Sequence, residues 1–141
     1  KRSWYIFFFQ LPVIPELAMR GRDWWMVAEQ LRRTSGPGSF TEADLALYRR
    51  AWSRPRAMTS MINWYRAFAR ARPKRTAPVQ VKVPTLMIWG VQDVALGREM
   101  AQPSIDLCEQ GRLVFLEEAT HWVQHDAADR VNELLLDWLS Q

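Results

Sequence analysis

With 141 residues, 48% of them hydrophobic, the chain has the composition of a globular protein, and no stretch approaches the roughly 20 apolar residues of a membrane span. Its formal net charge of +4 combines a basic first half, with 15 Lys and Arg against 5 Asp and Glu over residues 1–75, and an acidic second half, which indicates two modules. Because 16 of the 19 cations are Arg, spaced singly or in pairs between apolar residues, we expect solvated helix faces and no nucleic-acid partner.

The chain opens with an aromatic segment at residues 3–12, which reads SWYIFFFQLP. A basic start followed by apolar residues superficially resembles a secretory signal. Gln10, Pro12 and Pro15 interrupt the apolar run, however, and no small-x-small cleavage site follows. We therefore predict a soluble protein.

A first helix is predicted over residues 23–33, with Asp23 as its N-cap. The Ser-Gly-Pro-Gly sequence at residues 35–38 is expected to end it, because glycine and proline favour turns. Helical spacing places four residues on one apolar face of this helix: Trp24, Val27, Ala28 and Leu31.

Two further helices are predicted before residue 72. Thr41, with Asp44 three residues later, resembles a capping box at the start of a helix that runs to about Trp52. Pro55 suits the first turn of the next helix. The apolar residues of that helix lie at helical spacing on a face that we expect to be buried: Met58, Met61, Ile62, Tyr65, Phe68 and Ala69.

The second half has the pattern of a small parallel sheet. A proline-containing linker at residues 72–82 is expected to lead into it. Residues 84–89 and 113–116 are predicted to be short buried strands, with a helix over residues 98–110 between them and Gly111 beyond its end. Asp126 and Asp129 are expected to start a last helix, whose apolar face contains Val131, Leu134, Leu135, Trp138 and Leu139.

Cys108 is the only cysteine. One thiol cannot form an intrachain disulfide, and one thiol with two histidines makes a structural Cys/His metal site unexpected. We therefore predict no metal and no cofactor. A cytoplasmic, reducing compartment is consistent with this cysteine content.

His121 and Asp93 are the most informative residues. His121 lies in residues 118–124, after the second predicted strand, and Asp93 follows the first. An imidazole and a carboxylate at two strand ends can form a base and the group that orients it. A lone histidine can instead make a structural hydrogen bond, and Asp93 can cap the next helix. Asp126 is the rival carboxylate, which its expected role as a helix cap explains, and His125 is given no role.

Four segments in order resemble the α/β-hydrolase family, whose triad runs nucleophile, acid, histidine along the chain. Residues 89–93 (WGVQD) and 119–122 (ATHW) resemble the acid and histidine segments. Residues 3–12 and residues 63–66 (NWYR) look like the two tyrosine segments in the cap of epoxide hydrolases of that fold. The resemblance covers nearly the whole chain.

The resemblance implies an α/β chain with a partial α/β-hydrolase fold. Residues 1–78 would form a helical cap, and residues 79–141 the last βαβα part of the core sheet. The family places its His-Asp-x-Gly nucleophile turn and its His-Gly-x-Pro oxyanion segment before the cap, and neither motif occurs here. We therefore expect the C-terminal part of a longer enzyme, inactive and prone to associate when isolated.

The resemblance also implies the role of each site residue. Tyr5 and Tyr65 would donate hydrogen bonds to the epoxide oxygen, because phenols, with a pKa near 10, stay protonated at neutral pH. His121 would activate water against an aspartyl ester, and Asp93 would orient its imidazole. The substrates would be water and a small apolar epoxide, held in a pocket with walls formed by Trp4, Phe8, Phe9, Trp64 and Trp122.

Two other functions stay open. A haloalkane or haloacetate dehalogenase uses a similar His/acid pair but releases halide, which accepts hydrogen bonds from indole N–H groups such as those of Trp4, Trp64 and Trp122. The presence of two cap tyrosines favours the epoxide. Alternatively, the chain could be a non-catalytic domain that binds a small apolar ligand or a partner chain. Assembly into a homo-oligomer is also left open.

Overall fold

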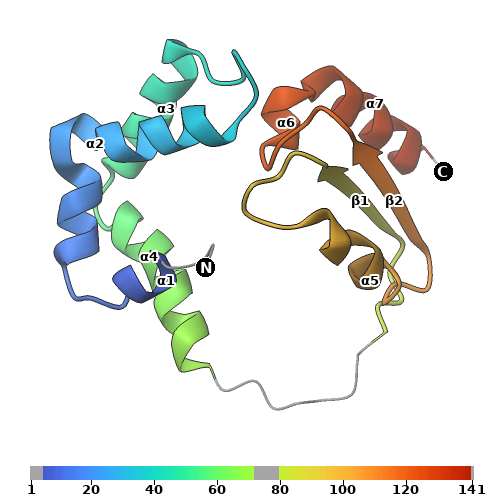
Figure 1. The fold of residues 1–141 in the computed structure, drawn as a ribbon, viewed down its shortest axis with the longest axis horizontal. Helices are drawn as coiled ribbons and strands as arrows, with labels where there is room; N and C mark the ends of the chain where they lie inside the picture. The colour runs from blue at the N-terminus through green and yellow to red at the C-terminus, as the bar shows by residue number, and fades with distance from the viewer. Residues whose placement is uncertain (1–4, 72–79, 141) are drawn as a thin grey trace. The chain divides into compact units, whose positions relative to one another are not determined.

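The computed structural model describes residues 5–71 and 80–140 (Figure 1). The chain divides into two compact units, one comprising Lys1–Leu31 and Phe40–Arg75, the other Arg32–Ser39 and Thr76–Gln141. The second unit therefore includes a short segment from the first half of the sequence. Trp4 and the predicted boundary between residues 78 and 79 lie outside the described residues.

The first unit is helical in the part that the structure describes. Its elements are α1 (Tyr5–Phe8), α2 (Ile14–Thr34, whose last residues belong to the second unit), α3 (Glu42–Trp52) and α4 (Ala57–Arg70). α4 packs against α1 and α3. This packing brings the aromatic opening of the chain beside the segment NWYR.

α2 corrects the prediction that a helix starts at Asp23. It begins at Ile14, and Gly21–Trp24 form a kink in which Asp23 has a left-handed backbone with φ 52°. Pro15 looks like a helix breaker in the sequence, but it lies in the first turn, where its missing N–H costs no hydrogen bond. The predicted face is confirmed at three buried residues: Trp24, at the end of the kink, and Ala28 and Leu31 beyond it.

The capping box of α3 is confirmed. Thr41 Oγ1 accepts a hydrogen bond from the Asp44 N–H, and the Asp44 carboxylate accepts one from the Thr41 N–H. The predicted start of the next helix at Pro55 is wrong, because α4 begins at Ala57 after Arg56, which has a left-handed backbone.

The predicted burial of one α4 face is only partly correct. Met58 and Ile62 are buried, whereas Met61, Tyr65 and Phe68 are exposed, with Tyr65 at 36%. The reason is geometric, because the short α1 covers only part of this face.

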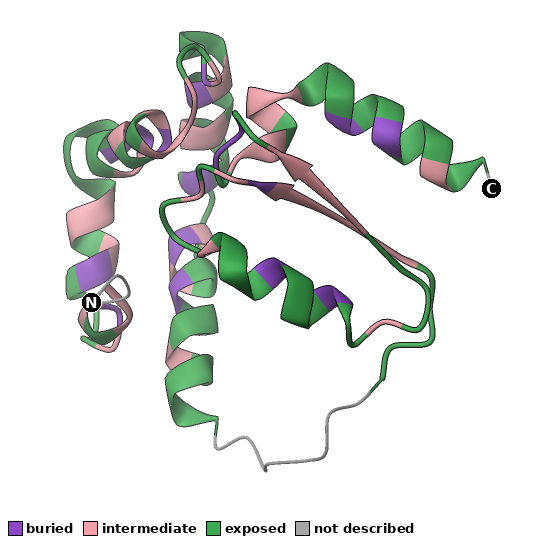
Figure 2. Ribbon diagram, turned by 45° about the vertical axis from the view of Figure 1, so that its right-hand side comes forward, coloured by how far each residue is buried: buried purple, intermediate pink, exposed green. Residues whose placement is uncertain are grey.

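The second unit contains two parallel strands, as predicted. β1 (Thr85–Gly90) pairs with β2 (Gly111–Leu116) in a register that runs from Thr85 opposite Gly111 to Gly90 opposite Leu116. Between them lie the 3₁₀ turn η1 (Arg98–Met100) and α5 (Ala101–Ile105). The predicted helix over residues 98–110 is therefore too long, and Gly111 opens β2 instead of following a helix. Figures 1 and 2 show the strand pair lying between α5 and α7.

The C-terminal helices correct the role predicted for Asp126. This residue ends α6 (Val123–Asp126), and α7 (Ala128–Leu139) begins after Ala127. α7 buries Val131 and Leu134, while Leu135 and Leu139 are exposed (Figure 2). No helix in the described ranges combines the length and the apolar character that crossing a membrane requires.

Candidate active site

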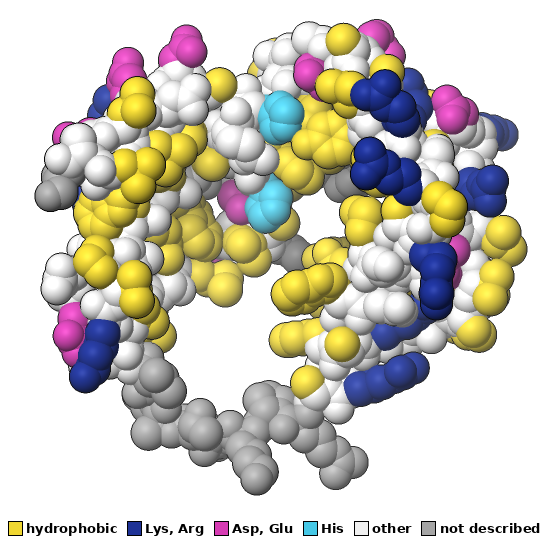
Figure 3. Space-filling model, turned by 180° about the vertical axis from the view of Figure 1, so that it is seen from behind, with side chains coloured by type: hydrophobic (Ala, Val, Ile, Leu, Met, Phe, Trp, Pro, Cys, Tyr) yellow, Lys and Arg dark blue, Asp and Glu magenta, His cyan; other side chains and the backbone are white. Residues whose placement is uncertain are grey.

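The two predicted catalytic groups meet at the carboxyl ends of the parallel strands. Asp93 lies in the loop after β1, and His121 in the turn between β2 and α6. His121 Nδ1 is 2.8 Å from Asp93 Oδ2, so the predicted hydrogen-bond contact is present. Figure 3 shows both histidines of the chain on one face, one of them beside an acidic side chain.

Asp93 is held so that one oxygen is available to the imidazole. Its Oδ1 accepts hydrogen bonds from the N–H groups of Ala95 (2.7 Å) and Leu96 (2.9 Å), while Oδ2 faces His121. Burial, with the side chain 7% exposed, raises the pKa of Asp93, but hydrogen bonds from Leu96, His121 and Ala95 outweigh it and lower the pKa overall. The carboxylate therefore stays ionised at neutral pH. Asp93 therefore accepts hydrogen bonds from N–H groups of the loop and is not the cap of a helix, because the next helical turn begins only at Arg98.

This contact selects the tautomer of His121. An ionised carboxylate only accepts hydrogen bonds, so Nδ1 carries the proton that faces Asp93 and Nε2 keeps its lone pair. The His121 side chain is 41% exposed. Its free nitrogen can therefore take a proton from water.

Gly90 allows the histidine loop to pass directly against β1. A Cβ atom at Gly90 would overlap the carbonyl oxygens of Ala119 and Thr120. The Gln92 N–H donates a 2.9 Å hydrogen bond to the Ala119 carbonyl, and Ala119 and Thr120 are both buried. The backbone just before His121 is thus fixed by the end of β1.

Gly90→Ala is therefore expected to displace the histidine loop. Because the obstructing atoms are backbone and not a flexible side chain, we expect a loss near the upper end of the usual overpacking range, about 3 kcal/mol in the free energy of unfolding. The measurement is urea unfolding of the purified protein. Gly21→Ala is the control, because no atom lies within 4 Å of the added Cβ there. Equal stability of both variants would contradict the close approach.

Tyr5 and Tyr65, the two tyrosines of the predicted cap segments, lie side by side in the first unit. The rings of Tyr5 on α1 and Tyr65 on α4 meet edge to face, with centroids 5.6 Å apart and an interplanar angle of 84°. Phe9 packs against both rings, at 5.7 and 4.9 Å. Burial, followed by the neighbouring Tyr5, raises the pKa of Tyr65, so this phenol stays protonated and able to donate.

The apolar residues predicted as pocket walls have different surroundings. Trp64 lines an open pocket of about 530 Å³, together with Ile6, Met61, Tyr65 and Phe68. Phe9 is buried against the tyrosines, and Phe8 packs on Phe9. The indole N–H of Trp122 donates to Thr34 Oγ1 at 2.8 Å, and its ring lies at right angles to that of His121. The roles of these residues, and of the tyrosines, toward a substrate stay predictions.

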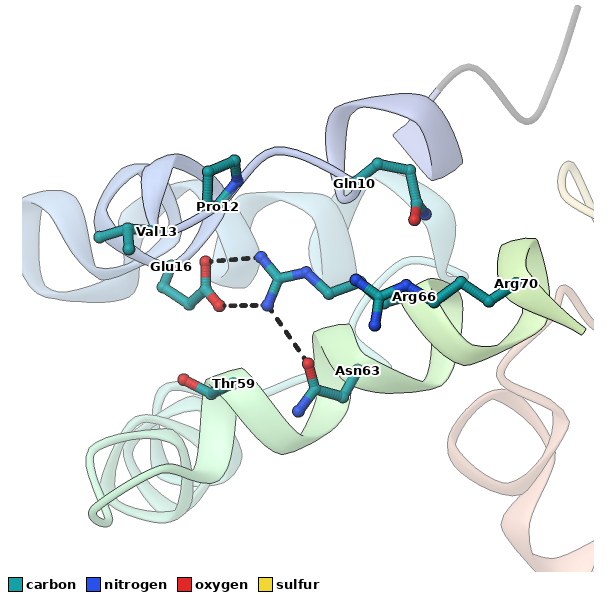
Figure 4. Close-up of a pocket in the computed structure, with 8 residues that line it drawn as sticks. All are labelled: Gln10, Pro12, Val13, Glu16, Thr59, Asn63, Arg66 and Arg70. Carbon is teal, nitrogen blue, oxygen red and sulfur yellow. Dashed lines mark hydrogen bonds and ion pairs between the residues drawn. The ribbon is translucent and has the colours of Figure 1, made fainter.

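Arg66, which follows Tyr65 on α4, is an additional residue with many hydrogen bonds in the first unit. Its guanidinium binds both carboxylate oxygens of Glu16, at 2.8 and 3.2 Å, and also donates to Asn63 Oδ1 (Figure 4). It further donates to the carbonyls of Phe9 (2.9 Å) and Leu11 (2.7 Å), so it ties the chain between α1 and α2 to α4. The hydrogen bond from Arg66, only partly offset by burial, lowers the pKa of Glu16.

Arg66→Ala is expected to destabilise the first unit by about 2–3 kcal/mol. The change leaves Glu16 and two carbonyls without their donor, although partial hydration keeps the loss below that of a fully buried pair. Because the pKa of Glu16 is lowered on folding, its contribution is complete above the unfolded value of about 4.3 and is lost as the pH falls through the lower folded value. Urea unfolding at neutral and acidic pH should show this. Arg70→Ala is the control, because Arg70 is an exposed residue of α4 that lines the same pocket as Arg66 (Figure 4). The carbonyl hydrogen bonds do not titrate, so part of the difference between the two variants should remain at acidic pH. A difference that is no smaller at acidic than at neutral pH would contradict the ion pair.

Among the described residues, no group of three or more His, Cys, Asp or Glu side chains is arranged to hold a metal ion. The pair of His121 and Asp93 can move a proton, and the phenols of Tyr5 and Tyr65, in the first unit, can donate hydrogen bonds.

Known proteins resemble this chain over almost its full length, although no protein-family model matches it. It is 39% identical over 138 residues to the AB hydrolase superfamily protein YfhM of Bacillus subtilis, 34% over 147 residues to Epoxide hydrolase 2 of Caenorhabditis elegans, and 33% to human Epoxide hydrolase 4. These alignments include 98–99% of this chain but 48%, 41% and 40% of the relatives. The chain thus spans less than half the length of these curated relatives.

Solved structures also resemble this chain in fold over nearly its full length. An epoxide hydrolase from Bacillus megaterium matches 99% of this chain and 52% of its own, with a TM-score of 0.79 and 21% identity. Cfl2 from Burkholderia cenocepacia matches 97% and 47%, with a TM-score of 0.80 and 23% identity.

Proposed function

We propose that this chain, a homologue of the C-terminal part of epoxide hydrolases with the α/β-hydrolase fold, carries the base, the acid and the cap tyrosines of an enzyme that hydrolyses epoxides to diols. The chain has the partial α/β-hydrolase fold that its sequence predicts. The observation that best supports the proposal is the contact between His121 and Asp93 at the ends of two parallel strands. Residues 1–78 would be the cap and residues 79–141 part of the core.

In the first step, an aspartate outside these 141 residues attacks one epoxide carbon. The ring C–O bond breaks, an ester forms, and negative charge develops on the former epoxide oxygen. Tyr5 and Tyr65 donate hydrogen bonds to that oxygen, and one phenol transfers its proton to it. The close packing of the two rings, and the raised pKa of Tyr65, support this role.

In the second step, Nε2 of His121 takes a proton from water as the water oxygen attacks the ester carbonyl. The ester C–O bond breaks, and the leaving diol oxygen takes the hydroxyl proton that the attacking water has left on the carboxyl group. The imidazolium then returns its proton through water to the phenolate of the first step, which restores the carboxylate, His121 and the tyrosine. Asp93 holds the Nδ1–H tautomer and stabilises the charged imidazolium that forms. No cofactor is needed for either step.

The substrate would be a small apolar epoxide. Its apolar group would bind the pocket beside Tyr65, where the lining consists of aliphatic and aromatic side chains. The free thiol of Cys108 is consistent with a cytoplasmic location.

The dehalogenase alternative has less support. A halide site needs free indole donors, whereas the N–H of Trp122 is bonded to Thr34. Trp64 still leaves one indole at the pocket, so the two reactions are best separated by experiment.

The test is turnover by the complete protein of styrene oxide, 1-chlorobutane and fluoroacetate, with diol and halide measured separately. We expect diol formation and no halide release. Halide release without diol formation would favour the dehalogenase, and ligand binding without either product would favour a non-catalytic domain.

A further inference from the structure

Asp126 accepts four hydrogen bonds, more than a helix cap requires. Its Oδ1 accepts from the Gly36 N–H (2.9 Å) and from Ser39 Oγ (2.5 Å). Its Oδ2 accepts from the N–H (2.7 Å) and the Oγ1 hydroxyl (2.5 Å) of Thr120. The carboxylate therefore joins two segments of the second unit that lie far apart in the sequence.

The donors match an ionised carboxylate. Burial raises the pKa of Asp126, but the hydrogen bonds from Ser39, Thr120 and Gly36 together lower it below the ordinary value. An ionised carboxylate accepts at both oxygens and donates at neither. A side-chain amide of the same shape would turn an N–H group toward two of the four donors.

The two residues that flank His121 are both hydrogen-bonded to other parts of the second unit. Thr120, which precedes it, is buried and bonded to Asp126, and Trp122, which follows it, donates its indole N–H to Thr34 Oγ1. The Trp122 backbone N–H also donates to Thr120 Oγ1 at 3.2 Å. Both neighbours of His121 are thus fixed, whereas its own ring is held by Asp93 and extends toward solvent.

We propose that Asp126 is the positioning residue of His121, and that its carboxylate sets the backbone of the turn from which the imidazole reaches Asp93. The catalytic consequence rests on the proposed function, but the structural one does not. Without the bridge, the turn is expected to relax and the contact between Nδ1 and Oδ2 to loosen, because that contact depends on where the turn places the imidazole.

The first test compares Asp126→Asn with Asp129→Asn in the complete protein. Asp129 lies exposed in the first turn of α7, so its substitution makes the same chemical change without the bridge. We expect Asp126→Asn to slow ester hydrolysis about tenfold or more while ester formation stays within about twofold, and the control to change neither step. An equal loss in both steps, or no loss, would overturn the positioning role.

Thr120 provides a second pair of variants in case Asp126→Asn does not fold. Thr120→Val removes the hydroxyl donor but keeps the shape, and Thr120→Ser keeps the donor. We expect Thr120→Val to slow ester hydrolysis selectively, and Thr120→Ser to hydrolyse the ester at the rate of the parent protein. Equal rates in the two variants would count against the proposal.

The third measurement needs no activity. ¹⁵N NMR of the imidazole reports which nitrogen carries the proton. We expect a single Nδ1–H tautomer of His121 in the parent protein and a mixture of tautomers in Asp126→Asn. An unchanged tautomer would overturn the positioning role even in a protein without epoxide turnover, whereas an inactive parent whose tautomer responds to Asp126 would contradict only the proposed function.

Discussion

Replacing His121 with alanine is expected to abolish diol formation while leaving ester formation intact. In the proposed mechanism, the imidazole acts only on the water that cleaves the ester, and loss of a general base costs roughly 10²–10⁴-fold in rate. The covalent intermediate should therefore accumulate. Mass spectrometry of the intact protein after mixing with styrene oxide should show one added substrate mass per chain.

His125→Ala is the matched control, because His125 lies four residues further along and has no proposed role. We expect it to turn over normally and not to accumulate the adduct. Unchanged turnover in His121→Ala, or an adduct missing from both the parent and this variant under rapid quenching, would contradict the assignment of His121.

Tyr5→Phe and Tyr65→Phe are expected to slow ester formation instead. Phenylalanine keeps the ring packing against Phe9 but lacks the hydroxyl, and loss of one oxyanion donor typically costs about 10²–10³-fold. The double variant should lose more than either single variant. The measurement is the rate of adduct formation after rapid mixing, with ester hydrolysis followed separately.

Tyr48→Phe is the control for these variants, since Tyr48 packs on Phe40 and Trp52 away from the tyrosine pair. It should leave both steps unchanged. Equal rates of ester formation in the parent protein and in both tyrosine variants would refute their role as donors.

The contact between His121 and Asp93 could be predicted because it follows from local signals and one topological rule. Each residue comes just after a short apolar run, and parallel strands bring their carboxyl ends to one edge. The capping box of α3 was similarly predictable, because Thr41 and Asp44 satisfy each other within one turn. In both cases, the partners are either close in sequence or placed by strand pairing.

The role of Asp126 could not be predicted in this way. Its partners Gly36 and Ser39 lie 90 and 87 residues away, and an aspartate before a helix gives the same signal whether or not it caps that helix. The kink in α2 was missed for a different reason. Its three left-handed residues, Arg22, Asp23 and Trp24, have no sequence preference for that conformation as strong as that of glycine.

In the proposed mechanism, the epoxide opens through an ester on a protein carboxylate, and water activated by His121 then hydrolyses the ester. A single-turnover reaction in H₂¹⁸O, with the complete protein in excess over styrene oxide, distinguishes this mechanism from direct attack by water. In the ester mechanism, the oxygen added to the substrate comes from the carboxylate, so the first-turnover diol is unlabelled and ¹⁸O appears in the protein. A diol labelled in the first turnover would show that water attacks the epoxide directly, and would contradict the ester mechanism.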